Sequence, residues 1–164
     1  MQRFFLTIGV SLLVLLAQTT LVPHLAIGTI IPDLLLIWIV YLGISRGHVP
    51  AMTAGFFLGL LMDTLAGDDG MLGLSSLTKT VAGFLAGYTF NENKILQILS
   101  GYQFLLILAA ASLVHDLLYF LIFLQGADLA WNEAIVRYGL PTTLYTLAAA
   151  LLPLFVFARR HRTP

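Results

Sequence analysis

Six runs of mostly apolar residues follow one another along this chain and dominate what it can fold into. They cover residues 4–22, 34–45, 50–67, 71–90, 95–125 and 138–158, and the second reaches a full crossing length only if it starts at residue 29. A helix needs about 20 such residues to cross the hydrocarbon core of a bilayer, which is about 30 Å thick. We therefore predict an all-α integral membrane protein in which residues 1–164 form a single six-transmembrane-helix bundle. The fifth run is long enough to tilt, kink or begin along the membrane interface.

The composition agrees with a chain whose main solvent is lipid. Hydrophobic residues make up 59% of the sequence and charged residues only 10%, whereas soluble domains carry about 25% charged residues. Cysteine is absent, which excludes disulfides, thiolate catalysis and cysteine metal sites. The net charge is zero and no basic run is interleaved with aromatic residues, so we expect no nucleic-acid partner.

The ends of two runs carry recognisable helix signals. Asp33 follows Pro32, which cannot continue a helix backward, and this pair predicts Asp33 as the N-cap of the second helix. The first run has a basic start like that of a signal peptide, but no small-x-small cleavage site follows it. We expect it to remain as an uncleaved first helix.

Lysine and arginine predict the orientation, because cytoplasmic segments of membrane proteins carry an excess of them. If both termini are cytoplasmic, the outer loops hold only Arg137. The cytoplasmic segments then hold Arg3, Arg46, Lys94, Arg159, Arg160 and Arg162. We expect these arginines to anchor the protein to the anionic lipid surface as well.

Glycines four residues apart lie on one face of the third and the fourth run. Gly55 and Gly59 share a narrow helix face with Asp63, and Gly83 and Gly87 align in the same way four residues apart. Small residues at this spacing let helices in lipid approach closely. These faces, together with Pro32 and Asp33, predict either internal packing or a surface for a partner helix, and the sequence alone does not separate the two.

Three charged residues, Asp63, Lys79 and Asp116, fall inside the predicted helices. An unpaired charge at the centre of a bilayer costs at least about 2.5–3.5 kcal/mol, so these residues should find partners. From their depths we predict that Lys79 pairs with Asp116 or Asp63, with Asp116 favoured. The pair would lock helices together; an ion path and a polar residue of a partner protein remain open as alternatives.

No motif for catalysis or metal binding emerges. His115 lies beside Asp116, but neighbours on a helix point about 100° apart, so we do not expect them to face one another. No serine lies in a G-x-S-x-G context and there is no H-E-x-x-H motif. We expect neither an enzyme nor a protein with a cofactor or metal.

Three stretches in a fixed order carry a resemblance to a known family. The sequence reads "PDLLLIWIVYLGISRG" from residue 32, "GFFLGLLMDTLAGDDGMLGL" from residue 55 and "VAGFLAGY" from residue 81. This order resembles that of the rod shape-determining protein MreD family. The likeness covers the whole chain in length and helix count, and its specific part is residues 32–90.

The resemblance implies a role in building the bacterial side wall rather than a reaction. MreD-like proteins lie in the cytoplasmic (inner) membrane and belong to the elongation machinery that supports peptidoglycan synthesis and cell shape. They bind MreC, which has one membrane helix, and through it act with MreB, RodA and a class B penicillin-binding protein. The family's fold is similar to that of the substrate-binding subunits of energy-coupling-factor transporters. A homodimer is also left open.

We therefore expect a non-enzymatic membrane scaffold that binds MreC. The first alternative is a vitamin-type binding subunit of a transporter, which needs convergent polar and aromatic groups near the outer side. A secondary transporter is the second alternative, and it usually shows inverted repeats and broken helices. A ligand that copurifies would favour the former alternative, and the companions recovered from native membranes would separate all three.

Overall fold

The computed structural model of this chain is helical over the residues it describes, which are 2–66, 71–124 and 131–160. No strand occurs in these three ranges apart from an isolated bridge between Ile27 and Ile30. The all-α prediction is confirmed. In chain order the elements are α1 (Gln2–Thr20), the 3-10 helix η1 (Val22–Leu25), α2 (Leu34–Arg46), α3 (His48–Ala66), α4 (Leu74–Gly87), α5 (Ile95–Leu99), α6 (Tyr102–Phe123), α7 (Trp131–Ala134), the π-helix η2 (Ile135–Gly139) and α8 (Leu140–Arg160).

Several of these helices suit a membrane. Within the described ranges, three stretches are long and apolar enough to cross one, namely His48–Leu65, Tyr102–Phe123 and Ile135–Phe155. Two apolar stretches, Phe5–Thr20 and Leu34–Arg46, are shorter. The structure is therefore that of a helical membrane protein, while six separate crossings remain a prediction.

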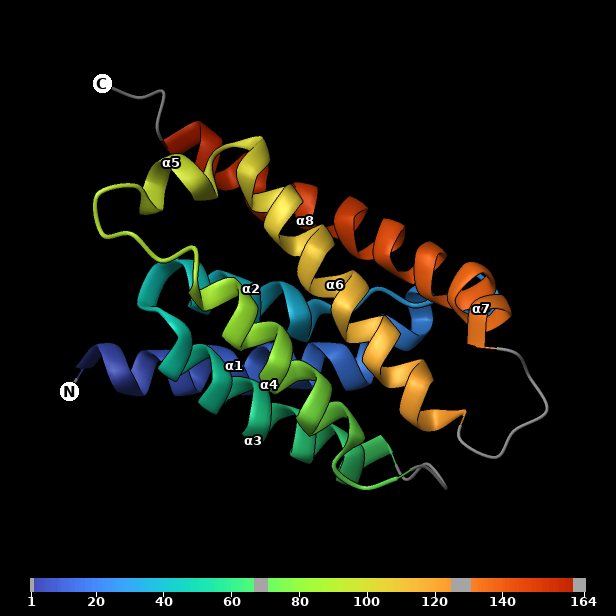
Figure 1. Cartoon of the computed structure of the whole chain (residues 1–164). Helices are drawn as coiled ribbons and strands as arrows, with labels where there is room; N and C mark the ends of the chain where they lie inside the picture. The colour runs from blue at the N-terminus through green and yellow to red at the C-terminus, as the bar shows by residue number, and fades with distance from the viewer. Residues whose placement is uncertain (1, 67–70, 125–130, 161–164) are drawn as a thin grey trace.

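The central element is α2, which packs against α1, α3, α4, α6 and α8. It contains 13 residues, which at 1.5 Å per residue makes it only about 20 Å long. Its sequence is apolar on every side, as expected for a helix that is surrounded by others. Leu35, Ile39 and Val40 are fully buried. The other helices therefore form a shell around α2 (Figure 1).

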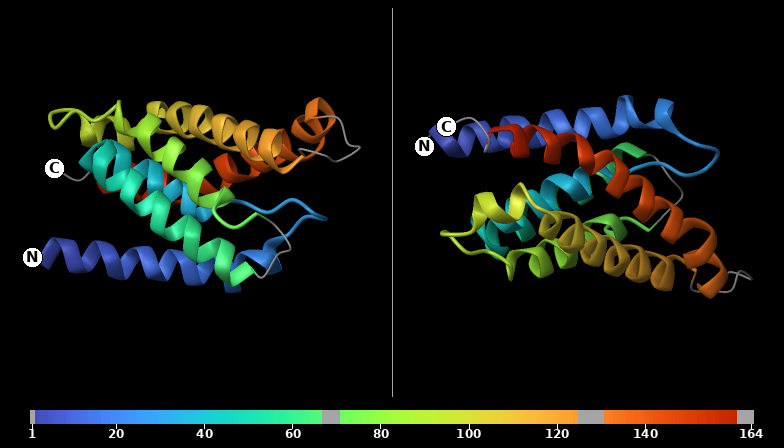
Figure 2. Two further views of the ribbon diagram at one scale, coloured as in Figure 1. Left: turned by 60° about the horizontal axis from the view of Figure 1, so that its bottom comes forward. Right: turned by 90° about the horizontal axis from the view of Figure 1, so that it is seen from above.

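The helices run between two ends of the bundle. At one end lie the start of α1, the junction of α2 with α3, α5 and the end of α8 (Figures 1 and 2). At the other end lie the ends of α1, α3 and α6 and the start of α4. The chain therefore crosses the bundle back and forth, and α1 begins at the end where α8 finishes.

The predicted fifth helix, residues 95–125, is not continuous. It divides into α5 and α6 at Ser100 and Gly101, and Gly101 is the N-cap of α6 with extended backbone angles (φ −113°, ψ 174°). An extended residue interrupts the helical hydrogen-bond ladder, so the axis can change direction there. The sequence left a kink in this run open, and the structure places the break at Ser100 and Gly101, so that α6 provides the long apolar segment.

The glycines of α3 face α4. A Cβ placed on Gly55 would lie 2.6 Å from the carbonyl oxygen of Lys79, and one on Gly59 would lie 2.5 Å from the Cα of Ser76. Real Cβ atoms essentially never come so close to backbone atoms. The small residues therefore serve internal packing here, which decides between the two alternatives left open by the sequence.

The glycines of α4 likewise pack against the backbone of α3. A Cβ on Gly83 would lie 2.8 Å from the carbonyl oxygen of Ala51, and a Cβ on Gly87 would overlap the backbone of His48. The contact between α3 and α4 is the most extensive between any two elements of the described chain. Both helices therefore approach one another with backbone against backbone, as small residues in membrane helices allow.

The first helix is held to the bundle by the buried Leu15, which packs against Leu35 and Leu58, and by polar contacts with the α2 segment. The indole Nε1 of Trp38 donates a hydrogen bond to Ser11 Oγ at 2.9 Å, and Gln18 is bonded to the backbone just before α2. Towards its N-terminus, α1 separates from α3 (Figure 2, left). Residues of both helices line a groove between them.

Candidate functional site

The N-terminus of α2 lies inside the bundle, and its first turn needs hydrogen-bond partners there. Asp33 is the N-cap, as the sequence predicts, and its Oδ1 accepts a hydrogen bond from the backbone N–H of Leu36 at 2.9 Å. Pro32, which is buried, precedes it and has no N–H that would need a partner. The chain before α2 is not helical, so other side chains must satisfy its remaining polar groups.

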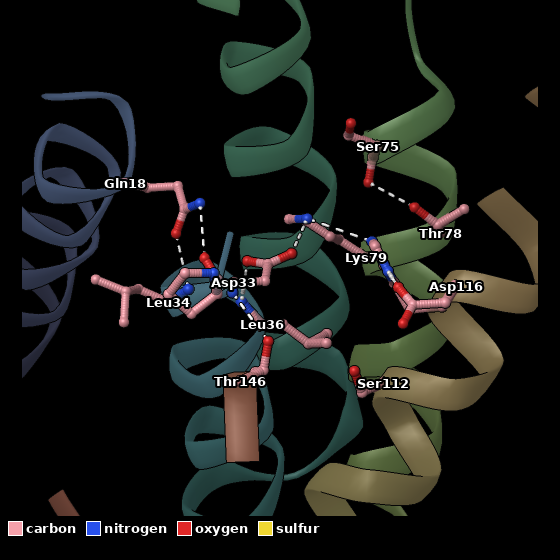
Figure 3. Close-up of polar contacts among 12 residues, drawn as sticks. Gln18, Asp33, Leu34, Leu36, Ser75, Thr78, Lys79, Ser112, Asp116 and Thr146 are labelled. Carbon is pink, nitrogen blue, oxygen red and sulfur yellow. Dashed lines mark hydrogen bonds and ion pairs between the residues drawn. The ribbon is translucent and has the colours of Figure 1, made fainter. Parts of the chain in front are cut away.

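Two polar residues from α1 and α8 provide these partners (Figure 3). Gln18 Nε2 donates to the carbonyl oxygen of Pro32 at 3.2 Å, and Gln18 Oε1 accepts from the N–H of Leu34 at 2.7 Å. Thr146 Oγ1 accepts from the N–H of Asp33 at 3.0 Å. Non-helical backbone at membrane depth is tolerated when protein groups satisfy it in this way.

Gln18→Leu should lower the free energy of unfolding by about 1–3 kcal/mol, because it leaves a buried carbonyl and a buried N–H without partners. Unfolding of the purified protein with increasing SDS in mixed micelles measures the change. Thr20→Val is the control, since this hydroxyl bonds only to the Leu16 carbonyl of its own helix. Equal stability of the Gln18 variant and the wild type would contradict the role assigned to Gln18.

Asp33 is also the ion-pair partner of Lys79 (Figure 3). Lys79 Nζ lies 2.5 Å from Asp33 Oδ2, and the side chains are 2% and 13% exposed. The prediction that Lys79 pairs directly with Asp116 or Asp63 was wrong. The reason is that the segment before α2 enters the bundle, which brings the N-cap carboxylate of Asp33 next to α4.

Asp116 belongs to the same network through His115. Lys79 Nζ lies 3.3 Å from His115 Nε2, and His115 Nδ1 lies 3.0 Å from Asp116 Oδ1. The expectation that the adjacent histidine and aspartate would not interact was therefore wrong. Their Cα–Cβ bonds diverge, but the imidazole ring is long enough to turn back towards the neighbouring carboxylate.

Hydroxyl groups complete the network on the side of α8. Thr143 Oγ1 donates to Asp116 Oδ2 at 2.8 Å, and Ser112 Oγ lies 3.1 Å from Thr143 Oγ1. All of these side chains are buried. We call this set the Asp33–Asp116 network; it links α2, α4, α6 and α8 and consists of Asp33, Lys79, His115, Asp116, Thr143 and Ser112.

Asp63 does not belong to the Asp33–Asp116 network and instead bonds to the start of α4. Its Oδ2 accepts a hydrogen bond from the backbone N–H of Gly73 at 2.9 Å. Gly73 is the N-cap of α4 and has a positive φ of 95°. Asp63 therefore ties the end of α3 to the start of α4, on the glycine face where the sequence placed it, and it does not take part in the ion pair.

The arginines predicted to face the cytoplasm gather at the opposite end. Arg46 is the last residue of α2 and is exposed. Arg3 lies in the first turn of α1, and Arg159 and Arg160 end α8. Arg162 lies outside the described residues. These helix ends are at the same end of the bundle (Figure 1), which agrees with an anchoring role that remains a prediction.

The described residues line a polar cavity and an apolar groove. A polar cavity of about 310 Å³ lies beside the Asp33–Asp116 network, and an apolar groove of about 560 Å³ lies between α1 and α3. The polar cavity is lined by Gln18, Thr29, Ile31, Pro32, Asp33, Met62, Ser75, Lys79, His115, Asp116, Tyr119, Phe120, Tyr138 and Thr142. The α1–α3 groove is lined by Thr7, Ile8, Ser11, Leu12, Leu42, Arg46, Val49, Pro50, Thr53, Ala54, Phe57, Leu58 and Leu61.

Comparison with known protein families identifies the chain. The family model described as rod shape-determining protein MreD matches residues 1–160 of its 164 residues. This chain belongs to the MreD family. No curated protein and no solved structure shows a significant match. The expected likeness to energy-coupling-factor subunits therefore stays a prediction.

Membership in the MreD family makes this a rod shape-determining membrane protein, as the resemblance predicted. The family is a structural component of the MreBCD shape complex and is not known as a family of enzymes. It lends no support to the alternative of a vitamin-type transport subunit. Among the described residues, no group of three or more His, Cys, Asp or Glu side chains converges to hold a metal ion.

Three polar residues at this site were missed from the sequence because the search for buried partners was limited to charged side chains. Gln18, Thr143 and Thr146 are uncharged but polar, and each lies within an apolar run. Thr143 and Thr146 are three residues apart, so they share one face of α8. Treating every polar residue in an apolar run as one that needs a partner would have found this face.

Proposed function

We propose that this MreD-family protein is a rigid membrane scaffold of the cell-elongation machinery, and that it binds the single membrane helix of MreC in the α1–α3 groove. Through MreC it would act with MreB, RodA and a class B penicillin-binding protein in side-wall peptidoglycan synthesis. The proposal rests on the family match and on one structural observation. That observation is a groove of about 560 Å³ that opens between two diverging helices.

The topology proposed for this scaffold has six crossings, formed by α1, α2, α3, α4, α6 and α8, with both termini in the cytoplasm. The excess of arginine and lysine at one end of the bundle supports this orientation. With 13 and 14 residues, α2 and α4 are shorter than the hydrocarbon core is thick. The other helices surround α2, and the segment before it has its polar groups satisfied by protein, so α2 need not reach both surfaces.

The lining of the groove suits another helix. Membrane helix contacts are enriched in small and hydroxyl residues, because these permit close packing and hydrogen bonds across the interface. The groove offers Thr7 and Ser11 from α1 and Thr53 and Ala54 from α3 between its apolar residues. A helix that carries small residues along one face could therefore pack between α1 and α3.

The rest of the bundle explains why this groove keeps its shape. Gln18 and Trp38 hold the C-terminal half of α1 against the α2 segment, and the glycine contact locks α3 to α4. Only the N-terminal half of α1 is left apart from α3. A scaffold for a partner helix needs a preformed surface of this kind, since preorganisation lowers the cost of binding.

Thr53→Trp should reduce the amount of MreC that copurifies with this protein by about tenfold or more, since overfilling a packed contact costs about 1–3 kcal/mol. Thr53 is exposed and lines the groove, and its hydroxyl bonds only to the carbonyl of Val49. Copurification from detergent-solubilised membranes measures the effect.

The matched control is Thr64→Trp on the same helix. Thr64 is also exposed and its hydroxyl also bonds within α3, to Leu61, but it does not line the groove. MreC recovery should stay unchanged in this variant. Equal recovery from both variants would place the partner elsewhere on the molecule.

A further inference from the structure

The polar cavity lies at the end of the bundle where α1, α3 and α6 finish. Residues of α1, α3, α4, α6, η2, α8 and the segment before α2 line it. It holds about 310 Å³, and its wall includes both carboxylates of the Asp33–Asp116 network. The network links α2, α4, α6 and α8, and holding these helices together does not require a cavity beside it. The charges that face the cavity indicate what the space can hold.

The hydrogen bonds of the network define its charge. Lys79 Nζ and His115 Nε2 are 3.3 Å apart, and a hydrogen bond between two nitrogens requires one of them to accept. These two side chains therefore share one positive charge. Both oxygens of Asp116 are engaged in hydrogen bonds, with His115 Nδ1 and Thr143 Oγ1. Two carboxylates, Asp33 and Asp116, thus face one cation.

An excess negative charge within a membrane bundle is costly unless something compensates it. Asp33 already has Lys79 at 2.5 Å, so the uncompensated carboxylate is Asp116. Among the residues that the structure describes, Lys79 is the only lysine or arginine that lines the polar cavity. A cation from outside the network would compensate this carboxylate, and the cavity gives it a place beside Asp116.

The remaining wall favours an organic cation over a metal ion. Tyr119, Phe120 and Tyr138 line the cavity, and aromatic faces attract ammonium and guanidinium groups. The ring of Tyr138 already holds such a group, since the guanidinium carbon of Arg137 lies 5.9 Å from its centroid. A metal ion would need several converging oxygen or nitrogen ligands. No cluster of three such acidic or histidine side chains exists in the described part of the chain.

We propose that the polar cavity binds a primary ammonium or guanidinium group, with Asp116 as its counter-ion and the three aromatic rings as its wall. The group can be a lysine or arginine side chain of another protein or a free amine. This inference is independent of the groove proposed for MreC, which lies between α1 and α3.

The test uses the full chain in lipid nanodiscs and saturation-transfer NMR at neutral pH. The probes are n-butylammonium, N-acetyl-lysine methylamide and N-acetyl-arginine methylamide, and the neutral control is N-acetyl-norleucine methylamide. The cationic probes should bind at least about tenfold more tightly than the neutral one. Preference for the blocked amino acids indicates a protein side chain as the natural ligand, whereas preference for n-butylammonium indicates a free amine.

Asp116→Asn should abolish this preference for cations. Asp63→Asn is the matched control, because Asp63 lies at the same end of the bundle, does not line the cavity and bonds to Gly73. It should leave probe binding unchanged. A similar loss in both variants would show a general effect of negative charge and would overturn the site.

A second variant keeps the test decisive if Asp116→Asn does not fold. Thr142 lines the cavity and is half-buried, so Thr142→Phe should fill the space without altering the network. Binding of the cationic probes should be lost. Binding that survives Thr142→Phe, or cationic probes that bind no better than the neutral one to the wild type, overturns the proposal.

Discussion

Replacing Lys79 by methionine should lower the free energy of unfolding by about 3–5 kcal/mol, because it leaves the Asp33 carboxylate unpaired inside the bundle. Lys79 is 2% exposed, and its ammonium group lies 2.5 Å from Asp33 Oδ2. Methionine is similar in length to the lysine stem and keeps its apolar contacts. The substitution therefore mainly removes the positive charge. Unfolding with SDS in mixed micelles measures the difference.

A second substitution identifies the partner of Lys79. Adding Asp33→Asn to Lys79→Met should restore most of the lost stability, since asparagine still caps a helix and no charge remains unpaired. Adding Asp63→Asn instead should restore nothing, because Asp63 bonds to the N–H of Gly73. The same comparison distinguishes the observed pair from the one that the sequence favoured. Recovery with Asp63→Asn, or none with Asp33→Asn, would contradict the ion pair.

Alanine at Gly59 should destabilise the bundle by about 1–3 kcal/mol or more, since it overfills the contact between α3 and α4. The new Cβ would meet the Cα of Ser76 at 2.5 Å, and that atom belongs to a backbone, which cannot turn aside as a side chain can. The two helices would have to separate. Unfolding with SDS measures the loss.

Gly9→Ala in α1 is the matched control. No atom lies within 4 Å of a Cβ built on Gly9, and alanine is about 0.8–1 kcal/mol more favourable than glycine inside a helix. The two glycine-to-alanine changes should therefore have opposite signs. A stable Gly59→Ala variant would mean that α3 and α4 do not approach as closely as described.

The glycine contact also bears on the search for the partner surface. Substitutions at Gly55 or Gly59 would reduce MreC binding through loss of the bundle, so they do not report on an interface. Thr53 is a better probe, because it is on the same helix but faces the α1–α3 groove. The face of α3 that holds the fold together is therefore separate from the face that we propose for the partner.

Local chemistry explains which parts of the site could be predicted from the sequence. Asp33 after Pro32 was identified as a helix cap because capping depends on a few adjacent residues. The alignment of Gly55, Gly59 and Asp63 followed from helix periodicity, and in the structure these three residues all face the α4 segment. The length of residues 95–125 left a kink open but did not locate the break at Gly101, since a lone glycine within an apolar run is also compatible with a continuous helix.

The partners across the bundle could not be predicted in the same way. Depth along each helix suggested Asp116 for Lys79, but depth does not reveal that the segment before α2 enters the bundle. That segment brings Asp33 next to Lys79 and leaves His115 to connect Asp116. The pairing depends on how the helices are placed side by side, and one sequence contains no measure of that placement.

By itself, the sequence determined that this chain is a helical membrane protein of the MreD family. The length of the apolar runs indicates membrane helices, and the order of the residues indicates the family. Only the tertiary structure decided which carboxylate meets the buried lysine, which glycine faces are closed and where a groove and a polar cavity remain. These features arise from contacts between residues far apart in the chain. Such contacts depend on the packing of whole helices, which local residue patterns do not specify.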